Sequence, residues 1–169
     1  MTVRLACPAD LPGFLTLAAQ VEPWFGPMVD DLGFHAAVGR NIDRGTALVA
    51  VAPSGPDLLG GLLFGARPPR HHIRWLVVSE AARGQGVGRA PVDEAVRRFV
   101  RCDGTLEVET FGADHPGAAV SGARVFYERL GFSPAEPAPV GPEGGSRQVY
   151  RRPVDQPEQR PHRSGCLQP

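Results

Sequence analysis

The alternation of apolar and polar residues predicts short strands and one-faced helices in the first seventy residues. Apolar residues at 11, 14, 15 and 18 share one helix face, and a second helix is expected from about residue 31 to residue 41. The proline- and glycine-containing segment 21–29 between these helices is expected to be a loop. Short apolar runs that are typical of strands occupy residues 3–6, 46–51 and 58–64.

The second half of the chain alternates strands with helices. The expected elements are strands at residues 72–78, 105–111 and 147–151, and helices at about residues 89–103 and 118–130. The order strand, helix, strand, helix implies a parallel strand pair, because a helix is the usual crossover between parallel strands.

The length of 169 residues suits one domain with a tail. We expect a single domain over residues 1–152. Residues 153–169 are rich in proline and have no apolar period, so they are expected to form a disordered tail. A short strand is expected to start at Phe132, and residues 134–145 are expected to form a mobile hairpin loop.

Charge and composition exclude several classes of function. The 18 acidic and 18 basic residues balance, whereas a sequence-independent nucleic-acid binder should show a basic surplus. All the basic residues are arginine, which rules out a P-loop lysine or a Schiff-base lysine. No apolar run reaches the ~20 residues of a membrane helix. The three cysteines lack CxxC spacing, and the histidines lack metal spacing, so we expect a cytoplasmic protein without a metal.

The most informative segment is a strand that runs into a glycine-rich turn, residues 76–88 (LVVSEAARGQGVG). Because the turn opens a helix, it should present unpaired N–H groups and a partial positive charge, which favour phosphate. The turn does not match the dinucleotide-binding pattern G-x-G-x-x-G, because Arg89 occupies the position of the third glycine. It does not match a Walker loop either, because that loop needs lysine. On this segment alone, a glycine-rich turn that binds no ligand remains the alternative interpretation.

The turn resembles motif A of the GNAT superfamily of acetyl-CoA-dependent N-acetyltransferases, R/Q-x-x-G-x-G/A, at Arg83, Gly86 and Gly88. About forty residues later, the segment 123–132 (ARVFYERLGF) is similar to the closing helix of that family, A-x-x-x-Y-x-x-x-G-F. The resemblance covers roughly residues 3–151 and is most specific over residues 76–132. It implies an α/β (α+β) fold with a mixed, mostly antiparallel sheet of six or seven strands and about four helices.

The resemblance also implies how acetyl-CoA would bind as co-substrate. Two central parallel strands would splay apart around a V-shaped cleft between residues 75–78 and 106–110. The strand residues Leu76, Val77 and Val78 would pair with the pantetheine arm, and the Val78 N–H would act as the oxyanion donor. Ser121 is the nearest polar side chain to the position, here Val120, at which the family often has asparagine. The diphosphate would contact Arg83, Gly84, Gln85, Gly86, Val87, Gly88 and Arg89.

Tyr127 matches the general acid of the family, and it would stabilise the departing thiolate. Because a phenol is a weaker acid than a thiol, we expect hydrogen bonding from Tyr127, with full proton transfer optional. Glu109 or His72 is the candidate base for the amine, and a solvated face of the sheet is the alternative reading of each. We expect no metal to take part in this chemistry.

The acceptor site is expected in residues 22–35, where aromatic faces and a carboxylate could hold a cationic amine. The candidates are Trp24, Phe25, Asp30 and Phe34. The resemblance implies direct transfer of an acetyl group to a primary amine of a small molecule or a peptide, without nucleic acid or membrane. The alternative is a catalytically silent acyl-CoA-binding module, and a homodimer is left open. Pro91 is expected to bend or loosen the start of the helix that follows the turn.

Overall fold

A computed structural model describes residues 1–53, 55 and 57–156 of the chain. Within these residues the strands form one seven-stranded sheet in the order β1-β2-β3-β4-β5-β7-β6. All neighbouring strands are antiparallel except β4 and β5, which are parallel. The strands are β1 (Thr2–Leu5), β2 (Ala47–Val51), β3 (Leu58–Arg67), β4 (Arg70–Val78), β5 (Gly104–Phe111), β6 (Ser133–Ala138) and β7 (Arg147–Val154).

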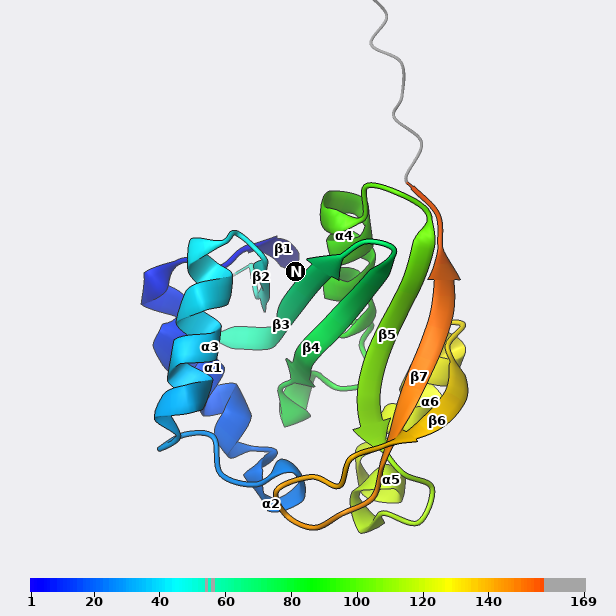
Figure 1. Ribbon diagram of the computed structural model, residues 1–169. Coiled ribbons are helices and arrows are strands. Elements are labelled where there is room, and N and C mark those ends of the chain that lie inside the picture. Colours follow the sequence, from blue (N-terminus) through cyan, green and yellow to red (C-terminus); the bar gives the residue numbers. More distant parts are fainter. Residues whose placement is uncertain (54, 56, 157–169) are drawn as a thin grey trace, which may run out of the picture.

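Helices cover the two faces of this sheet unequally (Figure 1). On one face, α1 (Leu11–Ala19) and α3 (Leu32–Asp43) pack on β2 and β3, with Phe14 and Val38 fully buried. On the other face lie α4 (Arg89–Phe99) and α6 (Ala123–Arg129), which contribute to a second apolar core, while α5 (Pro116–Ser121) lies at the end of β5. In the view of Figure 1, no helix lies in front of β4, β5 and β7. The mixed α/β architecture confirms the expected fold class.

Local sequence explains where several helices begin and end. Of the two aspartates that could cap α3, Asp30 and Asp31, Asp31 does so by accepting a hydrogen bond from the Gly33 N–H at 2.8 Å. The segment expected to be a loop contains a short helix, α2 (Glu22–Phe25), because Pro23 fits the first helical turn. The expected helix at residues 118–130 is two helices, since Gly122 adopts a left-handed conformation (φ 65°) between α5 and α6.

The carboxyl-terminal hairpin also departs from expectation. Pro134 and Pro137 lie in β6, not in a loop, because an edge strand tolerates residues that cannot donate a ladder hydrogen bond. The connecting loop is therefore shorter and spans residues 139–146. Strand β7 continues to Val154, two residues past the expected end of the domain, because the Val154 side chain is buried in the core. Residues 157–169, which hold most of the expected tail, lie outside the described residues.

The parallel pair separates part of the way along its length. Register partners run only from Arg70 with Thr105 to Ile73 with Val108, although β4 continues to Val78 and β5 to Phe111. A register shift against β3 occurs at the same level, opposite Arg74. The expected splayed cleft is therefore present. It opens beyond Val108, so Leu106 belongs to the paired part of the sheet.

Candidate active site

A cavity of about 740 Å³ fills the gap between the splayed strands. Its walls are β4 from Ile73 to Val78, β5 from Val108 to Phe111, the glycine-rich turn and α6. At one end it reaches the turn before α4. At the other end it reaches α2 and the loop between β6 and β7, which lie beside each other in Figure 1.

The turn provides a row of free backbone donors. The N–H groups of residues 84–88 make no hydrogen bond within the described part of the chain, whereas the flanking Arg83 and Arg89 amides donate to Glu80 and Gly86. Gly84 and Gly86 have φ values of 77° and 79°, which residues with a side chain rarely adopt. Consecutive amides in such a turn, next to a helix N-terminus, form a concave anion-binding site.

Pro91 does not disturb this arrangement. Helix α4 runs from Arg89 to Phe99 with Pro91 as its third residue, in the first turn, where proline is tolerated. The Arg89 and Ala90 amides before it still donate to the Gly86 carbonyl oxygen.

Three arginines surround the same end of the cavity: Arg83, Arg89 and Arg129. The Arg89 guanidinium donates to the carbonyl oxygen of Arg129 at 3.2 Å, which ties α4 to α6. Arg129 is not among the residues predicted from the sequence to bind the cofactor. Its position two residues after Tyr127, in the closing helix, is the feature that could have indicated it. Gln85 does not line the cavity, because its side chain donates to the Ala81 carbonyl oxygen at 3.1 Å.

The free edge of β4 presents backbone amides to the cleft. Ser79 donates its N–H to the Leu59 carbonyl oxygen at 2.9 Å, toward β3. Alternate residues of an antiparallel ladder bond to the same neighbour, so the amides of Leu76 and Val78 point away from β3. Both amides therefore face the splayed side, where β5 no longer pairs.

Tyr127 lines the cavity and is otherwise enclosed, with only 6% of its surface exposed. Its ring contacts Phe126 and Phe132 edge-on, at centroid distances of 5.1 and 5.5 Å. Its hydroxyl makes no hydrogen bond to any described residue, and burial raises the pKa of the phenol. The group therefore stays protonated, and it can donate a hydrogen bond into the cavity.

The two candidate bases differ in position. Glu109 lines the cavity, is exposed, and forms no ion pair within the described residues. His72 lies on the paired part of β4, outside the cavity lining, with its Nδ1 3.7 Å from Glu107. Ser121 lines the cavity, but its hydroxyl already donates to the Gly117 carbonyl oxygen at 2.6 Å.

The expected acceptor residues are only partly brought together. Phe25 lines the cavity, whereas Trp24, Asp30 and Phe34 do not. Phe34 packs on Trp75, with ring centroids 5.5 Å apart. Among the residues that the structure describes, no group of three or more metal-ligating side chains gathers. No helix in the described ranges is long and apolar enough to cross a membrane.

Arg147 is a cavity residue that the sequence prediction missed. Its guanidinium lies 4.6 Å from the centre of the Phe25 ring and 5.4 Å from that of Phe111. The pairing of β5 with β7 sets Arg147 opposite Phe111. Since this pairing joins residues 36 positions apart, no local pattern could have indicated it.

Comparisons with known proteins agree with this geometry. The family described as "Acetyltransferase (GNAT) domain" matches residues 33–134. A comparison with curated proteins finds no match. Several solved structures share the fold. A GNAT-family acetyltransferase from Bacillus cereus has a TM-score of 0.68 at 11% identity, over 93% of this chain and 98% of the other.

Two further solved structures share the fold. A ribosomal-protein-alanine N-acetyltransferase from Brucella melitensis has a TM-score of 0.67 at 21% identity, over 90% of this chain and 99% of the other. The protein yncA from Salmonella typhimurium, solved with acetyl-CoA, has a TM-score of 0.69 at 18% identity, over 94% and 96% of the two chains. These structures share the fold, and the family match over residues 33–134, which contain both motifs, shows that the chain belongs to the GNAT acetyltransferase family.

Proposed function

We propose that this chain is an acetyl-CoA-dependent N-acetyltransferase that transfers the acetyl group directly to a primary amine. Family membership supports acetyl transfer as the class of reaction. The single observation that carries the proposal is the continuous cavity. It joins the free amides of residues 84–88 to the Tyr127 hydroxyl and the Glu109 carboxylate along the open edge of β4.

The residues at the turn fit a diphosphate. Five free N–H groups and three nearby arginine side chains offer donors and positive charge to an anion that carries several oxygens. Toward the cleft, the amides of Leu76 and Val78 are free to pair with the amide groups of a pantetheine arm, as an added strand would.

Acyl transfer to nitrogen needs a neutral amine, because an ammonium has no lone pair. An unperturbed alkyl amine has a pKa of ~10.4, so deprotonation at pH 7 costs about 4.6 kcal/mol. Glu109 is the candidate acceptor of that proton, directly or through one water, because it lines the cavity and has no ion-pair partner among the described residues.

Attack of the amine nitrogen on the thioester carbon forms a tetrahedral intermediate with a negative oxygen, which the Val78 N–H would stabilise. Collapse of the intermediate breaks the carbon–sulfur bond, and the thiolate leaves. Tyr127 would then donate a hydrogen bond to the sulfur. Its raised pKa favours this role over complete proton transfer.

Replacement of Tyr127 by phenylalanine tests the proposal. We expect Y127F to bind coenzyme A normally in calorimetry and to lower kcat by on the order of 100-fold or more in a thiol-release assay. Y150F is the matched control, because it also removes a buried phenol, whose hydroxyl donates to Glu128 at 3.1 Å outside the cavity. It should cost about 1 kcal/mol of stability and retain turnover.

The binding-module alternative makes the opposite prediction. If the wild-type chain binds acetyl-CoA but releases no thiol with any amine, the enzyme proposal fails.

The pair of variants E109Q and H72Q identifies the base. E109Q should lower kcat/KM at pH 7 by about 100-fold and regain activity at higher pH, where more of the amine is already neutral. The same loss in H72Q alone would assign the role to His72.

A further inference from the structure

The acceptor end of the cavity is the part of the site that family membership leaves undefined. Its charged lining residues are Glu109 and Arg147, and its aromatic residues are Phe25 and Phe111. An aromatic face near a carboxylate would suit a cationic amine. Here the face of Phe25 is already covered by the Arg147 guanidinium at 4.6 Å, so the protein's own cation occupies that position.

Arg147 is enclosed but not fully bonded. Only 9% of its side chain is exposed. One Nη donates to Glu143 at 2.6 Å, while the buried Nε has no hydrogen-bond partner within the described residues. A buried, unsatisfied donor on a cation costs free energy, so the site favours additional negative charge beside this guanidinium.

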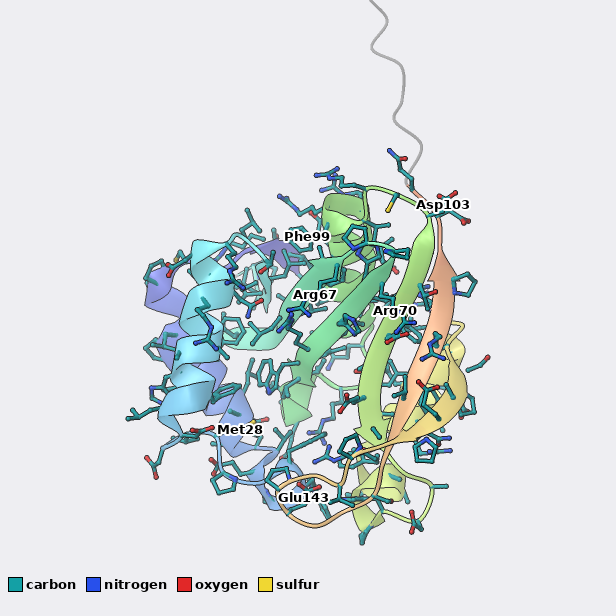
Figure 2. The ribbon with its side chains drawn as sticks, viewed as in Figure 1. Met28, Arg67, Arg70, Phe99, Asp103 and Glu143 are labelled. Atoms are coloured by element: carbon teal, nitrogen blue, oxygen red, sulfur yellow. The ribbon has the colours of Figure 1, made fainter. Side chains whose placement is uncertain are left out.

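The surroundings hold Arg147 in place. The β6–β7 loop contributes Glu143, which lies beside α2 in Figure 2. A Cβ on Gly26 would lie only 3.1 Å from Pro142, so this loop packs closely on the segment after α2. His115 accepts the Gly117 N–H at its Nδ1, and its Nε2 lies 3.4 Å from Glu143. The guanidinium is thus positioned before any acceptor binds.

The position of Arg147 relative to Glu109 suggests the chemistry of the ligand. Phe111 pairs with Arg147 and Glu109 pairs with Val149, so Arg147 and Glu109 are diagonal neighbours on one face of the sheet. Diagonal neighbours are separated by roughly 7–8 Å between backbone positions. One end of a small molecule could therefore meet a carboxylate, which attracts an amine, while its other end meets a guanidinium.

Resting on the proposed function, we propose that the acceptor amine also carries a carboxylate, which Arg147 binds. The substrate class is an amino acid or a short peptide whose carboxylate lies a few bonds from the amine. Arg74 also lines the cavity, but its guanidinium lies over Gly65 of β3, so Arg147 is the cation that this proposal uses. Polyamines and other acceptors without an anionic group should be poor substrates.

A screen with acetyl-CoA and matched amines tests this inference. The probes are amino acids and acidic dipeptides, the corresponding carboxamides, and aliphatic diamines. We expect the best acceptors to carry a carboxylate, with kcat/KM about 10- to 100-fold above that of the matching carboxamide. R147Q should bring this ratio close to one without changing the KM for acetyl-CoA.

Three further variants separate recognition from folding. R147K keeps the charge but not the planar fork, so part of the preference should return. E143Q removes the competing carboxylate and should lower the KM of carboxylate acceptors. R151Q is the matched control, because Arg151 lies on the same face of β7 and pairs with Glu107 and Glu136 outside the cavity. It should leave the ratio unchanged.

The outcomes distinguish this inference from the proposed function. Preferred acceptors without a carboxylate, or a preference that survives in R147Q, would overturn the inference and leave the acetyltransferase standing. Absence of thiol release with every amine would overturn the proposed function. In that case, calorimetry of the carboxylate probes with protein saturated with coenzyme A decides the inference, which stands only if binding is lost in R147Q.

Discussion

The tyrosine in the cavity makes stability depend on pH in the alkaline range. Burial raises the pKa of Tyr127, so the folded state holds the phenolic proton where an unfolded chain, titrating near ~10, releases it. The contribution of this group to stability is therefore complete below about pH 10 and is lost as the pH rises further.

We predict that Y127F loses less unfolding free energy between pH 9 and pH 11 than the wild-type chain does. Urea unfolding at several pH values measures this difference. Tyr150, whose pKa is also raised mainly by burial, remains in the variant, so part of the alkaline loss should persist. Identical pH dependence in wild type and Y127F would contradict the placement of this phenol in an enclosed site.

At the scale of single elements, the turn before α4 depends on two glycines with positive φ. We predict that G86A costs roughly 1–2 kcal/mol of stability, because a Cβ disfavours the left-handed conformation. It should also weaken coenzyme A binding several-fold, since the free amides of residues 84–88 lose their alignment. Thermal unfolding and calorimetry measure the two effects.

Gly45 offers a matched control for this substitution. Its φ is 64°, a Cβ there would meet nothing within 4 Å, and the residue is outside the cavity lining. G45A should show a similar loss of stability with unchanged coenzyme A binding. Equal weakening of binding in both variants would mean that the effect arises from general destabilisation.

The elements that the sequence predicted well have a local cause. The turn and its helix were recognisable because glycine spacing and the strand before it are contiguous in the chain, and the Asp31 cap acts on a neighbour two residues away. The break at Gly122 was missed because glycine also occurs inside helical patterns, and only the backbone angle shows that it ends α5. Strand β6 could not be predicted because its two prolines are typical of a loop, and the sequence does not show that the segment lies at the edge of the sheet, where prolines are tolerated.

At the scale of the whole molecule, the residues that the sequence could not assign are those brought together by distant pairing. Arg147 reaches the cavity through the register between β5 and β7, and His72 is kept out of it because the parallel pair is still closed at that level. The cofactor end could be predicted from two motifs, whereas the acceptor end depends on how loops and strands from three regions meet.

The open edge of β4 should respond directly to ligand. We predict that the amides of Leu76 and Val78, within the peptide of residues 74–79, exchange hydrogen quickly in the free protein and slowly with coenzyme A, because pairing removes them from solvent. The exchange rates of peptides from β2 should be unchanged by coenzyme A.

At a ligand concentration of about 100 times Kd, the complex should gain about 2.7 kcal/mol of stability. Mass spectrometry and thermal unfolding measure these effects, and unchanged exchange in residues 74–79 would contradict the binding mode.

The short contact between β4 and β5 leaves part of each strand without a partner on this side. Four residues of β4 pair with four residues of β5, so beyond them each strand has an edge without a hydrogen-bonded partner. A pantetheine chain lying there would serve as a temporary strand. The protein would then hold its full set of cross-strand bonds only while loaded, and each release of coenzyme A would leave the centre of the molecule looser until the next acyl donor arrives.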